Sequence, residues 1–169
     1  MSERPYTAAE LERIAADQQD PHWMEWLSHM SERIDQFLNV TVPDMPDNPW
    51  SDEGLNHAEA AALRIFPTME SVDLPENRDI SDQFHSYIGE VFRRNFEGEW
   101  RNVPDYDDDD HPKGFGPVIR LPYNPEYLAV FQLLTATMFR RTGSQWSRIF
   151  GYQAEDYETW KAGRTSPQG

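Results

Sequence analysis

The densest group of side chains able to do chemistry lies between Asp105 and Asp110. Asp105, Asp107 and Asp109 alternate, as do the first three ligands of an EF-hand calcium loop. The pattern then fails, because Asp110 stands where that loop needs glycine and Gly116 stands where it needs a bidentate glutamate. We therefore predict no metal ion here. The run is either a solvated connection or a surface that binds cationic side chains.

If the run is a binding surface, its partner is a basic protein. Carboxylates speed the approach of such a partner and set its orientation, whereas buried aromatic rings supply most of the affinity. Tyr106 and Phe115 are the nearby rings that could act as anchors. The predicted partner-binding residues are Asp105, Tyr106, Asp107, Asp108, Asp109, Asp110 and Phe115.

Other catalytic or metal-binding patterns are weak or absent from the sequence. The five histidines lack the paired helical spacing of a zinc protease, and there is no serine nucleophile elbow or phosphate-binding glycine loop. His22 and His29 are seven residues apart and could share a helix face, where we interpret them as surface residues. We predict no catalytic residue, no metal and no cofactor.

Glu90 is the basis of the main alternative to a binding protein. In this alternative the protein is an enzyme whose pocket is built from residues distant in sequence. Carboxylates are abundant in this chain, so one carboxylate is weak evidence for acid–base catalysis. The simpler interpretation is a half-buried carboxylate paired with Arg93, Arg94 or Arg120. The pocket of the enzyme hypothesis would contain Glu90, Trp100, Arg120 and Tyr123.

The overall charge narrows the class of partner. With 30 acidic and 15 basic residues, the chain has a formal net charge of -15 at pH 7. Such a field repels nucleic acid and anionic membranes and attracts basic proteins. We therefore expect a basic protein partner, no nucleic acid and no membrane. The same acidity would also suit an adaptor protein of a high-salt cytoplasm, and it would then be unrelated to partners.

Cysteine content and the N-terminal residues favour a cytoplasmic protein. The chain has no cysteine, which excludes disulfides and suits a reducing compartment. Residues 1–7 lack the apolar stretch of a signal peptide. Thirteen arginines against two lysines are typical of a GC-rich genome such as that of an actinobacterium.

Helices and one hairpin must position these side chains. Apolar residues recur every three or four positions, which predicts helices over 7–17, 20–38, 51–66, 79–95 and 124–141, with a further short helix over 144–150. Residues 99–103 and 117–121 alternate in polarity and predict two antiparallel strands. The expected fold is α+β, with about five amphipathic helices around one short antiparallel β-hairpin. We expect one domain over 1–164 and a flexible tail over 165–169.

The 79–95 helix has the most continuous apolar face and should lie at the centre. Gly89 lies inside it, where glycine costs about 1 kcal/mol relative to alanine, so we place Gly89 against the sheet or a crossing helix. The predicted core residues are Phe84, Ile88, Val91, Phe92, Trp100, Phe131 and Leu134.

One block of the sequence carries a resemblance. It comprises residues 87–91 (Tyr-Ile-Gly-Glu-Val), a basic pair, residues 98–100 (Gly-Glu-Trp) and the strand over 116–121. This block resembles small actinobacterial proteins in which a Tyr-aliphatic-Gly-Glu helix leads into a Gly-x-Trp strand. In general type, the chain is similar to immunity proteins of bacterial polymorphic toxin systems, which are small, acidic and cysteine-free. This second resemblance implies an inhibitor that neutralises a basic secreted toxin domain, and it assigns no residues.

Overall fold

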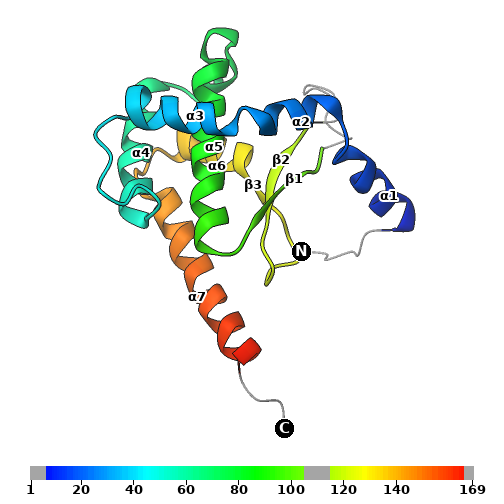
Figure 1. Cartoon of the computed structure of the whole chain (residues 1–169). Helices are drawn as coiled ribbons and strands as arrows, with labels where there is room; N and C mark the ends of the chain where they lie inside the picture. The colour runs from blue at the N-terminus through cyan, green and yellow to red at the C-terminus, as the bar shows by residue number, and fades with distance from the viewer. Residues whose placement is uncertain (1–6, 105–114, 166–169) are drawn as a thin grey trace.

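The computed structural model describes residues 7–104 and 115–165 (Figure 1). In these residues, seven α-helices and a small antiparallel sheet confirm the predicted α+β class, with more helices than expected. A short π-helix, η1 (Phe37–Thr41), and two 3₁₀ helices, η2 (Glu70–Asp73) and η3 (Pro75–Asn77), join some of them. The α-helices are α1 (Ala8–Asp17), α2 (Pro21–Ser28), α3 (Met30–Gln36), α4 (Asp52–Ile65), α5 (Arg78–Asn95), α6 (Val130–Arg140) and α7 (Gln145–Thr165).

The sheet contains the predicted hairpin and one further strand. β1 (Glu99–Asn102) pairs antiparallel with β2 (Pro117–Arg120), with Trp100 opposite Ile119. β3 (Leu128–Ala129) pairs with the other edge of β2. The prediction that a helix begins at Asn124 is therefore wrong: the Asn124 side chain accepts a hydrogen bond from the Glu126 backbone N–H in a turn, and α6 begins only at Val130.

α5 forms the centre of the molecule, with α4 on one side, the sheet on the other and α3 lying across it (Figure 1). Its glycine packs against the sheet as expected, because a methyl group at Gly89 would lie 2.0 Å from Cη2 of Trp100. Trp100 and Phe131 were also predicted to be core residues, but both are only half-buried. Five predicted core residues are fully buried: Phe84, Ile88, Val91, Phe92 and Leu134.

The N-terminal helices begin where their capping residues predict. The Thr7 hydroxyl accepts from the Glu10 N–H while the Glu10 carboxylate accepts from the Thr7 N–H, which forms a capping box. The Asp20 carboxylate accepts from the N–H groups of His22 and Trp23, and Pro21 occupies the first helical position.

The helix expected over 20–38 is interrupted at His29, whose backbone has φ -98° and ψ 10°. Arg33 donates to the Trp26 carbonyl at 2.6 Å, and the same carbonyl accepts a backbone hydrogen bond from the His29 N–H at 3.3 Å. The apolar spacing continues across the break, which is why the sequence pattern does not reveal it.

The C-terminal segment was predicted to be a short helix, but α7 is a single helix of 21 residues. Gly151 and Gly163 lower its helical propensity, and both lie in open space within it. α7 packs on α4 near its start and extends away from the body of the molecule at its end (Figure 1). Thr165 of the expected flexible tail ends this helix, and residues 166–169 lie outside the described residues. None of the described helices combines the length and apolar character needed to cross a membrane.

Candidate functional site

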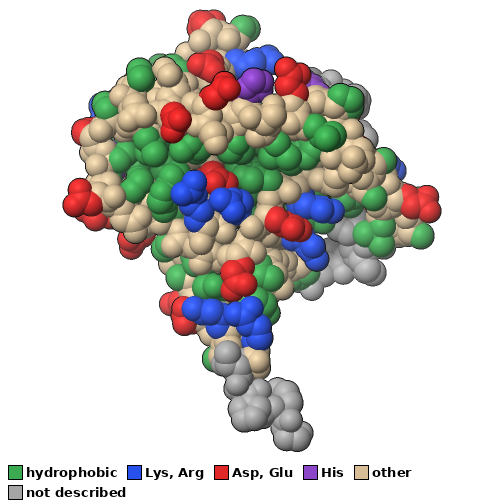
Figure 2. Space-filling view, in the orientation of Figure 1, with side chains coloured by type: hydrophobic (Ala, Val, Ile, Leu, Met, Phe, Trp, Pro, Cys, Tyr) green, Lys and Arg blue, Asp and Glu red, His purple; other side chains and the backbone are tan. Residues whose placement is uncertain are grey.

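A polar groove runs between α2 and α3 on one side and the start of α5 on the other. Its volume is about 520 Å³, within the usual range for ligand sites. Acidic and histidine side chains lie side by side over α2 and α3 at the top of Figure 2. The groove is lined by His22, Glu25, Trp26, His29, Glu32, Arg33, Gln36, Asp79, Asp82 and Gln83.

Among the described residues, the lining contains four carboxylates and one guanidinium. Glu25, Glu32 and Asp79 are exposed, and Asp82 is half-buried. All four lie on α2, α3 or α5, and the buried faces of these helices fix the backbone positions of the four carboxylates. The groove can therefore attract a cationic group without reorganising its own backbone.

Arg33, the guanidinium in the lining, already has partners within the protein. Its Nε donates to the Ser86 hydroxyl at 2.8 Å, and its guanidinium lies 4.1 Å from the centre of the Trp26 ring. Burial lowers the pKa of Arg33, and the charges of Asp82 and Asp79 oppose that shift. Because an arginine is normally charged to beyond pH 12, it neutralises about one of the four carboxylates and leaves the groove negative.

The groove ends at His22, whose ring stacks on Phe115 with 5.3 Å between the ring centres. Phe115 also packs against Trp26 and Phe131, so it is a half-buried member of an aromatic cluster. Its predicted contact with a partner stays a prediction. The other predicted partner-binding residues lie outside the described residues: Asp105, Tyr106, Asp107, Asp108, Asp109 and Asp110.

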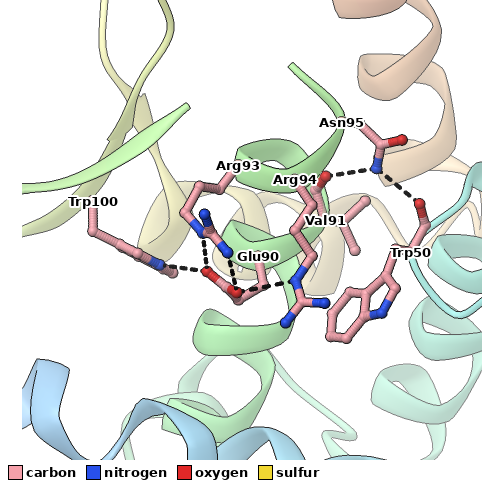
Figure 3. A network of polar contacts seen from close by, with 7 residues as sticks. All are labelled: Trp50, Glu90, Val91, Arg93, Arg94, Asn95 and Trp100. Atoms are coloured by element: carbon pink, nitrogen blue, oxygen red, sulfur yellow. Dashed lines mark hydrogen bonds and ion pairs between the residues drawn. The ribbon is translucent and has the colours of Figure 1, made fainter. Parts of the chain in front are cut away.

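Glu90 forms the other polar centre, on the opposite half of α5 (Figure 3). It is 4% exposed, and its carboxylate accepts from the Trp100 indole N–H at 2.8 Å. Arg93 donates two hydrogen bonds to it and Arg94 donates one. The Arg94 guanidinium also lies 3.9 Å from the centre of the Trp50 ring. The expected pairing of Glu90 with Arg93 and Arg94 is present, and Arg120 is not part of it.

This arrangement suits structure better than acid–base chemistry. Burial alone would raise the pKa of Glu90, but the hydrogen bonds from Arg93, Trp100 and Arg94 lower it below its usual value. A carboxylate held ionised by several donors is a poor general acid and a weak base. The other two residues of the hypothetical enzyme pocket bond elsewhere: Arg120 pairs with Glu99 at 3.1 Å, and Tyr123 donates to Gln153 at 2.8 Å.

His85 is a buried titratable residue that the sequence did not single out. Its Nδ1 lies 3.5 Å from the Asp82 carboxylate without hydrogen-bond geometry, and its ring packs 4.3 Å from Phe131. Within the described part of the chain, no group of three or more His, Cys, Asp and Glu residues could hold a metal ion.

The groove was not predicted, although the sequence contains a signal for it. Polar residues recur at alternating three- and four-residue spacing along α2 and α3, which places them on one helix face. We considered only the two histidines of this stripe, and the break at His29 was not expected. The stripe consists of His22, Glu25, His29, Glu32 and Gln36.

A scan against protein-family models, a search of curated proteins and a search of solved structures each found no match. The chemistry of the groove itself indicates what it can bind: ionised carboxylates accept charge-assisted hydrogen bonds from lysine or arginine side chains.

Proposed function

We propose that the protein is a non-enzymatic binding protein whose acidic groove takes lysine or arginine side chains of a basic protein partner. The observation that carries the proposal is the charge of the groove: in its described lining, four carboxylates stand against one guanidinium, which already donates to Ser86 and Trp26. The likeness to immunity proteins favours an inhibitor that neutralises a secreted toxin domain in the cytoplasm.

The groove would act mainly on association and specificity. Two charges 4 Å apart attract by about 4 kcal/mol at an effective dielectric of 20, yet exposed ion pairs contribute only about 0–1 kcal/mol after screening. Four such contacts together would change affinity by roughly tenfold or more. Because exposed charges are screened by salt, we expect binding to weaken as ionic strength rises.

The test compares two variants with the same change in net charge. The groove variant carries Glu25→Gln, Glu32→Gln, Asp79→Asn and Asp82→Asn. The control neutralises exposed carboxylates that do not line the groove, through Glu12→Gln, Glu155→Gln, Asp47→Asn and Asp156→Asn.

Binding of a labelled nona-arginine peptide would be measured by fluorescence anisotropy at low and high salt. The groove variant should lose roughly tenfold more affinity than the control at low salt, and its salt dependence should be flatter. Equal losses in the two variants would contradict the proposal, because overall charge would then explain binding. A basic protein that co-purifies with the parent chain from a lysate of the source organism would then be tested for binding to the groove variant and to the control.

A further inference from the structure

A second concavity lies on the other side of the aromatic cluster, between α6 and the start of β2. Its volume is about 570 Å³, enough for a small organic molecule. Phe131, Thr135 and Phe139 of α6 line it at four-residue spacing, and Val118 and Met69 lie on the facing walls. Residues at this spacing share one helix face, so the cleft is bounded by a continuous stripe of α6.

The walls of this cleft are mainly apolar and one of its rings is unusually exposed. Phe139 has 75% of its surface exposed, although it lies at the edge of a concave site. Phe131 is half-buried, because its ring packs against His85 and Phe115 on the side away from solvent. A ligand that filled the cleft would remove apolar surface of Phe139 from water, at about 25 cal/mol for each Å² buried.

Polar groups without partners stand among these apolar walls. Within the described residues, the side chains of Gln132, Thr135 and Arg140 take part in no hydrogen bond or ion pair. Asp73 also lines the cleft. A pocket of apolar walls with a few convergent polar groups is the usual form of a small-molecule site.

Arg140 is the cationic group that the described lining of the cleft offers to a ligand. The neighbouring Arg141 does not line the cleft, because its guanidinium is held by the carbonyls of Phe66 and Leu63 at 3.1 and 2.9 Å. Within the described residues, Arg140 and Asp73 are the charged groups of the lining, and Arg140 is the one that can pair with an anion. A planar guanidinium pairs with a carboxylate through two parallel hydrogen bonds.

We infer that the cleft between α6 and β2 is a second binding site, for a small molecule with an apolar body and one carboxylate that pairs with Arg140. This site is independent of the acidic groove, which attracts groups of the opposite charge. Its apolar walls provide the binding energy, and Arg140 selects the head group.

Three probes with the same body separate these contributions: 4-phenylbutyrate, 4-phenylbutylamine and 4-phenyl-1-butanol. Each would be titrated into the full chain, and backbone amide shifts would be followed by NMR. We expect 4-phenylbutyrate to bind best, with roughly millimolar affinity for so small a ligand, and to shift the amides of α6. Arg140→Gln should weaken it by roughly threefold to fivefold and leave the alcohol unchanged. Phe139→Ala should weaken all three probes.

Arg164→Gln is the matched control, because it removes the same charge at the far end of α7 (Figure 1). It should leave the affinity for 4-phenylbutyrate unchanged. Tighter binding of the amine, or equal effects of Arg140→Gln and Arg164→Gln, would overturn the assignment of a carboxylate ligand. Shifts confined to residues that do not line the cleft, or no binding by any probe, would overturn the site itself. The groove variant should still bind 4-phenylbutyrate. Each of the two proposals can therefore be contradicted without affecting the other.

Discussion

At the level of single residues, the contact between Gly89 and Trp100 explains why the Tyr-Ile-Gly-Glu motif of α5 is followed by the Gly-Glu-Trp motif of β1. The indole lies where a side chain at position 89 would be, and its N–H reaches the carboxylate of the next residue, Glu90. Glycine leaves room for the ring, and glutamate satisfies its donor. The Tyr-Ile-Gly-Glu block and the Gly-Glu-Trp block are thus two halves of one packing unit between α5 and β1.

Gly89→Ala tests this contact. The added methyl group would meet the indole at 2.0 Å, so we expect a loss of about 1–3 kcal/mol from overpacking, more than the ~1 kcal/mol that alanine gains in a helix. Gly151→Ala in α7 is the control, since nothing lies within 4 Å of its added Cβ, and it should be neutral or stabilising. Urea denaturation would give the free energy of unfolding of both variants. Equal stability of the two variants would show that Trp100 moves aside at little cost.

At the level of elements, a buried carboxylate holds the start of α7. Glu59 of α4 is 0% exposed and accepts from the backbone N–H groups of Gln145 and Trp146, at 3.0 and 2.8 Å. These N–H groups have no partner within α7, and a negative charge there complements the helix dipole. Trp146 is itself fully buried, so the contact fixes both the position and the direction of α7.

Glu59→Gln should therefore destabilise the protein by about 1–3 kcal/mol, because the amide can replace only one of the two acceptors and carries no charge. Hydrogen exchange should show a loss of protection in the first turn of α7 before the core is affected. Glu155→Gln, an exposed change on the same helix, should stay within about 0.5 kcal/mol of the parent. Unchanged protection in the Glu59 variant would mean that side-chain packing alone holds α7.

At the level of the whole molecule, the charge is unevenly distributed. In the view of Figure 2, lysine and arginine side chains gather over the lower half of α5, the strands and α7, whereas the acidic groove lies at the other end. Several of these cations are paired: Arg120 with Glu99, and Arg164 with Glu97.

The acidic run over 105–110 contributes five of the negative charges of the molecule. Its five aspartates repel one another by roughly 0.7 kcal/mol for each neighbouring pair at about 6 Å in water, less after screening by salt. Changing Asp107, Asp108, Asp109 and Asp110 to Asn should therefore leave the melting temperature level or slightly higher. If the run contributes to binding, the same variant should bind nona-arginine more weakly, with a flatter salt dependence. Unchanged affinity at low salt would identify the run as a solvated connection.

The sequence by itself determined the fold class, the positions of most helices and the antiparallel hairpin. These features depend on local signals: the capping side chains of Thr7, Asp20 and Ser51, the apolar period of α5, and the alternation in β1 and β2. It also indicated that Glu90 pairs with Arg93, Arg94 or Arg120, and its partners are the two arginines three and four positions away on the same helix.

Tertiary structure alone decided the features that depend on contacts between distant segments. The late start of α6 follows from β3 pairing with β2, and the position of the start of α7 depends on Glu59, 86 residues away from Gln145. The acidic groove requires α3 and α5 to lie together, and Arg33 of α3 donates to Ser86 of α5 beside it. A periodic pattern shows which face of a helix is buried. It does not show which polar faces will meet, because exposed charges carry little energy and leave no constraint on sequence spacing.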